Sequence, residues 1–431
     1  MAQNNLIDVK CFGLEIGRLG LDPNQKKSYF QFHPEFLETE KFSQLFPETG
    51  ILKRVPQVQV FSEFFNSTFH GLPPMFADSL PDAFGNIIFQ KWLESEGRSL
   101  TEISPLEQLA YVGRRGMGAL EYYPAKEISP GNSINLSSII KILEEVLYSK
   151  TSVHASKLDH ASLLNIFKMG TSAGGARPKL LIAENKENGA IFPGDVNFEE
   201  DFNHYLVKLS LETNQDYKPE LIEYTYYLLA KDLGIQMMPS KLIDEKHFAT
   251  LRFDRQNGKK KHILTASGLT GWDFQKPEPS SYENLFELAL FLKIPHNEIE
   301  ELYKRMVFNF LFKNTDDHLK NHSFIYEEEN NSWNLAPAYD LTLALNPFLP
   351  FKSISRALSI GGKRQNIQKD DLLHFAETYT IKNPGKIISD TLEAIQRWPD
   401  LARENGLSNG LIEKTRNLLA IGFWLLAVGY F

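Results

Sequence analysis

One interruption in the C-terminal third of the chain constrains the fold most. Beyond about residue 280 the apolar pattern is mostly helical, whereas residues 314–341 (NTDDHLKNHSFIYEEENNSWNLAPAYDL) indicate a loop, a strand, a turn, a strand and a loop. Asp316 and Asn321 precede the first of these strands, and Asp340 stands at the exit of the hairpin. The segment predicts a chain that mixes helices and strands, with its polar residues in loops.

These three residues are of the types that phosphoryl transfer requires. One carboxylate must orient the attacking hydroxyl, and two oxygen ligands must hold magnesium against the nucleotide phosphates. Asp316 with Asn321 matches the D-x-x-x-x-N spacing of a kinase catalytic loop. Asp317 is a rival, but its fifth-next residue is His322, and magnesium prefers oxygen ligands. We predict Asp316 as the catalytic carboxylate and Asn321 and Asp340 as metal ligands. A turn that merely closes a loop is the alternative.

A glycine-rich segment, residues 170–179 (GTSAGGARPK), stands between two expected strands. Glycines let backbone N–H groups approach phosphate oxygens closely. The same residues match the G-x-S-x-G of serine hydrolases, but that motif needs a helix directly afterwards, and Pro178 opposes one. A phosphate loop is therefore favoured over a hydrolase elbow or an ordinary flexible loop. Its predicted nucleotide-binding residues are Gly170, Thr171, Ser172, Ala173, Gly174 and Gly175.

Lys208 lies inside an expected apolar strand, residues 205–209 (YLVKL), where an unpaired charge would be costly. Glu223 follows 15 residues later, near the start of a helix that Pro219 opens and Gly234 closes. Kinases use a strand lysine held by a helix glutamate to contact the nucleotide phosphates. We predict this pair here. A lysine at a strand edge beside a solvent-facing glutamate is the alternative.

Composition narrows the class of protein. The chain has 431 residues and a net charge of −8, which gives no general basic surface for nucleic acid. The single cysteine, Cys11, excludes an intramolecular disulfide and a zinc site built on several cysteines. The N-terminus lacks the pattern of a signal peptide, so we expect a cytoplasmic protein. The apolar residues 418–431 are short for a membrane span and are expected to form a buried terminal helix.

Several other segments have expected structures. Residues 5–20 predict strands, residues 57–65, 84–97 and 136–148 predict helices, and Asn188-Gly189 predicts a hairpin turn. Residues 252–255 (RFDR) have two open interpretations, ion pairs at a junction between lobes or a solvated strand end.

Taken together, these segments resemble the HipA family, the serine/threonine kinase toxins of bacterial toxin–antitoxin pairs. The resemblance extends over nearly the full length. NTDDHLKNHSF is its most specific segment, PAYDL carries the metal aspartate, and GTSAGGARPK resembles the family's Gly-rich loop. YLVKL and EYTYYLLAKDLGI carry the lysine and the glutamate, and GRRGMGALEYYP ends a segment that resembles the N-terminal subdomain.

The resemblance implies an α+β, two-lobed protein-kinase-like fold with a small N-terminal α/β subdomain and a mostly helical C-terminal lobe. The expected domains are 1–127 (N-terminal subdomain), 128–255 (N-lobe with the Gly-rich loop) and 256–431 (helical C-lobe with the catalytic loop). It also implies ATP and Mg²⁺ as cofactors, and self-phosphorylation of the Gly-rich loop at Ser172, with Thr171 beside it leaving the modified hydroxyl open.

The implied activity is phosphorylation of a cellular protein, an aminoacyl-tRNA synthetase in known members. The implied partner is a helix-turn-helix antitoxin, HipB-like, through which alone DNA would be contacted, and no membrane is involved. Two alternatives stay open. The chain could be a catalytically weak scaffold and co-repressor, or it could be a small-molecule kinase on the same fold.

Overall fold

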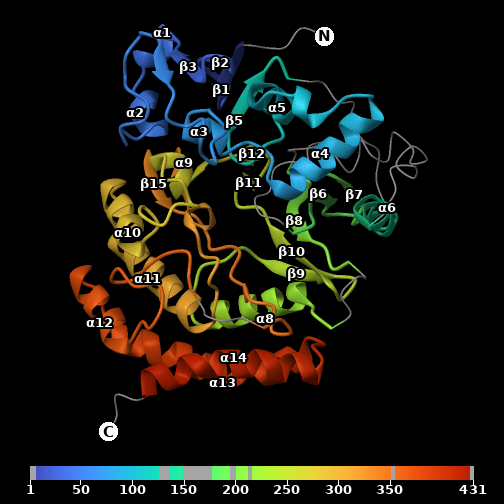
Figure 1. The fold of residues 1–431 in the computed structure, drawn as a ribbon, viewed down its shortest axis with the longest axis vertical. Helices are drawn as coiled ribbons and strands as arrows, with labels where there is room; N and C mark the ends of the chain where they lie inside the picture. The colour runs from blue at the N-terminus through green and yellow to red at the C-terminus, as the bar shows by residue number, and fades with distance from the viewer. Residues whose placement is uncertain are drawn as a thin grey trace. The chain divides into compact units, whose positions relative to one another are not determined.

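The computed structural model describes residues 6–125, 135–148, 177–194, 200–211, 216–350 and 355–427. The chain divides into two compact units. Unit 1 comprises Met1–Leu211, Ala249–Gly271 and Ile325–Ser332, and unit 2 comprises Glu212–Phe248, Trp272–Phe324 and Trp333–Phe431. Helices and strands are mixed along the chain (Figure 1), which confirms the predicted α+β class. The domain limits expected from the sequence stay predictions.

Unit 1 begins with an antiparallel five-stranded sheet in the order β4-β3-β2-β1-β5. The strands predicted within residues 5–20 are confirmed. The helix predicted at residues 57–65 is wrong, because Gln59–Phe61 instead forms an edge strand against Ser28–Phe30. The strands are β1 (Leu6–Cys11), β2 (Leu14–Asp22), β3 (Lys27–Phe32), β4 (Gln59–Phe61) and β5 (Leu120–Tyr123).

The core of this sheet follows from the period-two pattern of β1, in which Ile7, Val9 and Cys11 are buried on one face. Aromatic rings fill the adjoining space, and Phe32 packs edge-on against Phe42, with ring centroids 4.9 Å apart. The helices of this region are α1 (Pro34–Leu37), α2 (Lys41–Leu45), α3 (Pro74–Ala77), α4 (Ala83–Ser95), η1 (Leu100–Glu102) and α5 (Pro105–Val112). The helix expected at residues 84–97 is thereby confirmed.

A second sheet of unit 1 carries the segment after the Gly-rich loop. Strands β6 (Lys179–Asn185), β7 (Ile191–Pro193) and β8 (Phe202–Lys208) are antiparallel, with β6 between the other two. Gly189 takes a φ of +69° in the turn between β6 and β7, which confirms the predicted hairpin. Strand β10 (His247–Leu251) follows β8 in the sheet, and its last three residues belong to unit 1. Helix α6 (Leu136–Tyr148) confirms the helix predicted before the loop.

The remainder of unit 1 consists of short elements, together with Ile325–Ser332 from the tip of a later hairpin. They are β11 (Arg255–Gln256), β12 (Lys259–Lys260), β13 (His262–Thr265) and α9 (Ala266–Thr270). The Asp78 carboxylate accepts hydrogen bonds from the backbone N–H and the hydroxyl of Thr265, at 2.8 and 2.9 Å, and so joins α9 to the N-terminal region of the same unit.

Unit 2 is mostly helical, as the sequence predicts. Pro219 begins α8 (Pro219–Asp232), and Gly234, with a φ of +72°, follows its end, as expected for these two residues. Helices α13 (Pro384–Glu404) and α14 (Asn409–Ala427) lie side by side (Figure 1). The other elements are β9 (Ser240–Ile243), α10 (Tyr282–Phe291), α11 (His296–Leu311), η3 (Leu319–Asn321), α12 (Lys369–Thr378), and the hairpin β14 (Ser323–Glu327) and β15 (Ser332–Leu335), which contributes to both units.

The apolar C-terminal residues lie in α14 as far as Ala427, and the side chains of Leu418 and Leu419 are buried. In the part of the chain that the structure describes, no helix combines the length and the apolar character that crossing a bilayer demands.

His262 is a titratable group enclosed in the apolar part of unit 1. Its side chain is fully buried, its ring lies near Phe12 and Phe46, and its Nε2 is 3.1 Å from the carbonyl oxygen of Leu45. Burial lowers the pKa of His262 from 6.5 to about 4. Between pH 6.5 and about pH 4 the unfolded chain therefore binds a proton here that the folded chain does not bind.

We expect His262→Gln to be less stable than the parent at pH 7 but less sensitive to acid. Stability due to His262 is fully present above pH 6.5 and is lost as the pH falls toward 4, at ~1.4 kcal/mol per pH unit. Urea titrations at pH 7 and pH 5 should show the parent losing about 2 kcal/mol more than the variant. Equal losses in the two proteins would contradict the assignment.

Candidate active site

The predicted catalytic loop begins where α11 ends, inside unit 2. Lys313 takes a φ of +56° just after the helix and turns the chain into the loop. The side-chain amide of Asn314 then donates to the Oδ1 of Asn309 and to the backbone carbonyl of Asp340, each at 3.0 Å. Asn314 is buried, so these bonds hold the helix, the loop and the segment after β15 together.

Asp316 and Asn321 lie on this loop and are joined directly. The side-chain amide of Asn321, in η3, donates to the backbone carbonyl of Asp316 at 2.8 Å. Asp316 is exposed and Asn321 is half-buried, so both side chains are accessible to a ligand. Because Asn321 uses its amide nitrogen for this bond, its amide oxygen can face a metal ion.

Asp340 has an unusual backbone. Its φ of +57° places it in the left-handed region, which non-glycine residues enter mainly where surrounding contacts hold them. The neighbouring Ala338 forms a short parallel bridge with Met237, and its N–H donates to the carbonyl of Gln236 at 2.8 Å. Such strain at a half-buried aspartate is typical of functional sites.

A small pocket in unit 2 joins the loop to the residues around Asp340. Asn321 and Asp317 line it, whereas Asp316 and Asp340 do not. Its lining residues are Arg305, Asn309, Asn314, Asp317, Asn321, His322, Ala338, Tyr339 and Leu341.

The two neighbouring aspartates have opposite environments. Asp317 is fully buried, and its Oδ2 accepts hydrogen bonds from the Tyr282 hydroxyl at 2.7 Å and from the guanidinium of Arg356. Asp316 is exposed on the loop. Burial lowers the pKa of the adjacent His322 to about 4, so this imidazole is neutral at pH 7. An aspartate already bonded to two buried groups is poorly placed to meet a substrate.

The other predicted residues lie elsewhere in the chain. Lys208 is the last residue of β8, opposite Lys179 on β6, and it is buried in unit 1. Glu223 is buried on α8 in unit 2. The two residues belong to different units, and their pairing stays a prediction. The predicted phosphate loop, Gly170 to Gly175, lies outside the described residues.

Sequence reasoning overlooked a buried ion pair next to the Gly-rich loop. Lys179 Nζ lies 3.1 Å from Asp82 Oδ2, and both side chains are almost fully buried in unit 1. Asp82 also caps α4 by accepting a hydrogen bond from the Gly85 N–H at 2.5 Å. Lys179 follows Pro178 at the head of an apolar strand, and that placement was the available signal.

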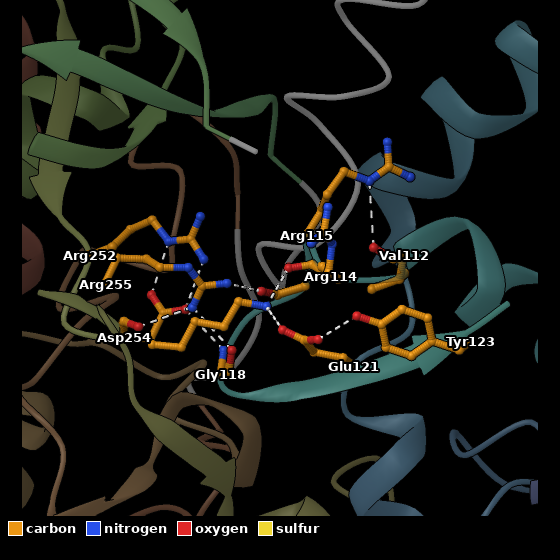
Figure 2. Close-up of polar contacts among 11 residues, drawn as sticks. Val112, Arg114, Arg115, Gly118, Glu121, Tyr123, Arg252, Asp254 and Arg255 are labelled. Carbon is orange, nitrogen blue, oxygen red and sulfur yellow. Dashed lines mark hydrogen bonds and ion pairs between the residues drawn. The ribbon is translucent and has the colours of Figure 1, made fainter. Parts of the chain in front are cut away.

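The RFDR segment forms ion pairs and is not a solvated strand end. Figure 2 shows the guanidinium groups of Arg252 and Arg255 directed at the carboxylate of Asp254. The nitrogen–oxygen distances of these two ion pairs are 2.8 and 2.5 Å. All three side chains are buried in unit 1. Although burial opposes ionisation, the two arginines hold the pKa of Asp254 well below its usual value. The interpretation as ion pairs is confirmed; the predicted junction between lobes stays a prediction.

This cluster also fixes the loop between α5 and β5. The Gly118 N–H donates to the Asp254 carboxylate at 2.9 Å, and Arg255 donates to the carbonyls of Gly118 and Gly116 at 3.0 and 2.6 Å (Figure 2). Nearby, Lys260 pairs with Glu121 at 2.7 Å. The charged groups of Asp254, Arg255 and Lys260 thus have both ionic partners and backbone hydrogen bonds.

The donor set around the loop suits magnesium. Hard divalent cations take oxygen ligands, and magnesium needs only one or two carboxylates or amides when phosphates and waters complete its shell. Within the described ranges no group of three or more His, Cys, Asp or Glu side chains could hold a metal by itself. The predicted site of Asn321 and Asp340 would need further oxygen ligands, such as nucleotide phosphates and waters.

The fold is a kinase-like α+β fold. A HipA of Shewanella oneidensis MR-1, solved as a complex of HipA, HipB and operator DNA, matches with a TM-score of 0.67 and 18% identity over 98% of each chain. At this identity the likeness shows the fold alone.

Family models match both parts of the chain. The HipA N-terminal domain matches residues 7–123, and the HipA-like C-terminal domain matches residues 171–399. The chain therefore belongs to the HipA family, which confirms the resemblance drawn from its motifs. A relative from Sinorhizobium fredii (strain NBRC 101917 / NGR234), Y4dM, carries a name that describes it as a kinase. It is 27% identical to this chain over 194 residues, which are 41% of this chain. The match spans 46% of that relative, less than half its length.

We expect Asp254→Asn to destabilise unit 1 by about 3–5 kcal/mol, because it leaves two buried guanidinium groups without their shared carboxylate. Asp8→Asn is a matched control, since Asp8 forms an exposed pair with Arg18 in the same unit and should change stability by less than ~1 kcal/mol. Native-state hydrogen exchange at the amides of β1 measures both effects. Unchanged exchange in the Asp254 variant would show that the cluster contributes nothing to the fold.

Proposed function

We propose that this protein is an ATP-dependent serine/threonine protein kinase. The contrast between two adjacent aspartates carries the proposal. Asp317 is buried and hydrogen-bonded, whereas Asp316 is exposed on the loop. The side-chain amide of Asn321 donates to the backbone carbonyl of Asp316 at 2.8 Å and so fixes the loop there. A group that orients an acceptor hydroxyl must be reachable by that hydroxyl, and Asp316 alone of the pair meets this requirement.

The metal ligands in this proposal are Asn321 and Asp340. Bound magnesium would neutralise charge on the nucleotide phosphates. The bond from Asn314 to the carbonyl of Asp340 ties Asp340 to the same loop that carries Asp316. Asp316, proposed to orient the acceptor hydroxyl, and Asp340, proposed to bind the metal, therefore belong to one hydrogen-bonded framework. This arrangement supports a role for both residues in the same active site.

The phosphate contacts in this proposal come from Lys208 and the Gly-rich loop. Lys208 is the last residue of the strand β8 and is buried, and kinases contact the nucleotide phosphates with a strand lysine. In the proposed complex Glu223 orients Lys208, and the backbone N–H groups of Gly170 to Gly175 surround the phosphates.

Membership of the HipA family supports a proposal for the physiological role. The HipA of Shewanella oneidensis is described as part of a toxin–antitoxin system and is seen with HipB and operator DNA. For this chain we propose a toxin that phosphorylates a cellular protein, such as an aminoacyl-tRNA synthetase, in the cytoplasm. A HipB-like helix-turn-helix partner would restrain it and would make the DNA contacts, in keeping with the net charge of −8.

We expect Asp316→Asn to lower phosphate transfer from ATP by about 10²–10⁴-fold, because the amide cannot accept a proton from the acceptor hydroxyl. Transfer of labelled phosphate to the protein itself and to a cell lysate measures the effect. Asp400→Asn, at an exposed position on α13, is the control and should leave transfer unchanged.

Calorimetry with Mg-ATP distinguishes the alternatives. The Asp316 variant should bind nucleotide within a few-fold of the parent affinity. A parent protein that binds no Mg-ATP would overturn the proposal in favour of a scaffold. Labelling of no protein other than the kinase itself would favour a small-molecule acceptor.

We expect Ser172→Ala to abolish self-phosphorylation and Thr171→Ala to retain it, since the resemblance assigns the modified hydroxyl to Ser172. Mass spectrometry after incubation with Mg-ATP locates the phosphate. Ser389→Ala, which removes a hydroxyl from α13, is the control. Phosphate found on Thr171 of the parent would show that the neighbouring hydroxyl is the acceptor.

A further inference from the structure

The partner of the buried Asp317 comes from a distant part of the chain. The guanidinium of Arg356, 39 residues away, donates to the Oδ2 of Asp317, and the two side chains are 4% and 0% exposed. The same guanidinium lies 5.5 Å from the ring centroid of Tyr282 and 5.7 Å from that of Phe310. Arg356 is thus held by a carboxylate and two aromatic faces.

The chain beside Arg356 also bonds to the loop. The backbone N–H of Ala357 donates to the carbonyl of Thr315 at 2.8 Å. Thr315 and Asp317 flank Asp316, so the residues on both sides of the proposed catalytic aspartate are bonded to the two-residue segment Arg356–Ala357. Asp316 itself is left exposed between them.

This segment is in turn anchored by Arg364. Its guanidinium donates to the carbonyl of Arg356 at 3.2 Å, to that of Ala357, and to those of Pro277 and Ser280 at 2.6 and 2.8 Å. Five donors in a rigid fork allow one arginine to bind several carbonyls at once. The position of Arg356–Ala357 is therefore determined by contacts within unit 2.

Tyr282 connects the ion pair to the metal side of the site. Its hydroxyl donates to Asp317 at 2.7 Å and accepts a hydrogen bond from Asn309 at 3.1 Å. Asn309 accepts from Asn314, which donates to the carbonyl of Asp340. One continuous chain of hydrogen bonds thus runs from Arg356 to the backbone of Asp340.

We propose that Arg356 and Asp317 are positioning residues that set the backbone of the catalytic loop so that Asp316 meets the acceptor hydroxyl. This inference rests on the proposed kinase function and assigns to that site a residue beyond the catalytic motifs. In this proposal the pair of Arg356 and Asp317 affects the rate at which bound ATP is used and leaves the affinity for Mg-ATP unchanged.

The first test is Arg356→Lys, which keeps the charge but loses the planar fork. We expect kcat for phosphate transfer to fall about 10–100-fold, because small misplacements of a reacting group have effects of that size. The KM and the calorimetric Kd for Mg-ATP should stay within about two-fold of the parent values. Lys363→Met is the matched control and should leave kcat unchanged. Lys363 lies between Ala357 and Arg364 in the chain, is exposed, and pairs with Asp371 at 2.7 Å.

The second test separates positioning from stability. Arg356→Met alone leaves a buried carboxylate unpaired and should lower the thermal stability of the protein. Adding Asp317→Asn removes that charge and keeps an acceptor for Tyr282, so the double variant should regain most of the lost stability. We expect its kcat to stay low. Recovery of kcat together with stability would overturn the proposal, as would an unchanged kcat in Arg356→Lys.

Phosphate transfer by the parent protein distinguishes failure of the kinase assignment from failure of the positioning role. A parent that transfers no phosphate overturns the kinase assignment, and the inference falls with it. A parent that transfers phosphate, with variants of Arg356 as active as the Lys363 control, overturns the positioning role alone.

Discussion

The candidate site depends on the hydrogen bonds of one buried amide, that of Asn314. Its nitrogen donates to Asn309 at the end of α11 and to the carbonyl of Asp340, and the side chain of Asn314 is itself buried. Leaving such acceptors unpaired would cost about 1–3 kcal/mol each. The catalytic loop, the helix before it and the strained backbone of Asp340 therefore keep a common geometry.

Within that geometry, environment gives two adjacent carboxylates different tasks. Arg356 and Tyr282 satisfy Asp317, so its charge is balanced inside the protein. Asp316 stays exposed, and the negative charge of the neighbouring Asp317 is already balanced by Arg356. The same principle separates acid and base roles in many enzymes that carry paired carboxylates.

Local patterns predicted the parts of the fold that local chemistry determines. Pro219 and Gly234 bounded α8 correctly, and Asn188-Gly189 marked its hairpin. The helix predicted at residues 57–65 was wrong because part of this segment pairs with β3, which lies about 30 residues earlier in the chain. Such pairing with a distant strand overrides local helix propensity. The bond between Arg356 and Asp317 could not be predicted either, because nothing in the spacing of two charged residues 39 positions apart indicates a contact.

Buried ion pairs recur where loops must be held in place. Asp254 and its arginines fix the Gly116–Gly118 backbone in unit 1, and Asp317 with Arg356 fixes the loop around Asp316 in unit 2. Burying charges costs several kcal/mol per ion, so well-packed apolar residues would often give equal or greater stability. We infer that these pairs are explained better by geometry than by stability. An apolar contact can slide, whereas a charge-assisted hydrogen bond from a guanidinium to a carboxylate is directional, and the fork of Arg252 on Asp254 is bidentate.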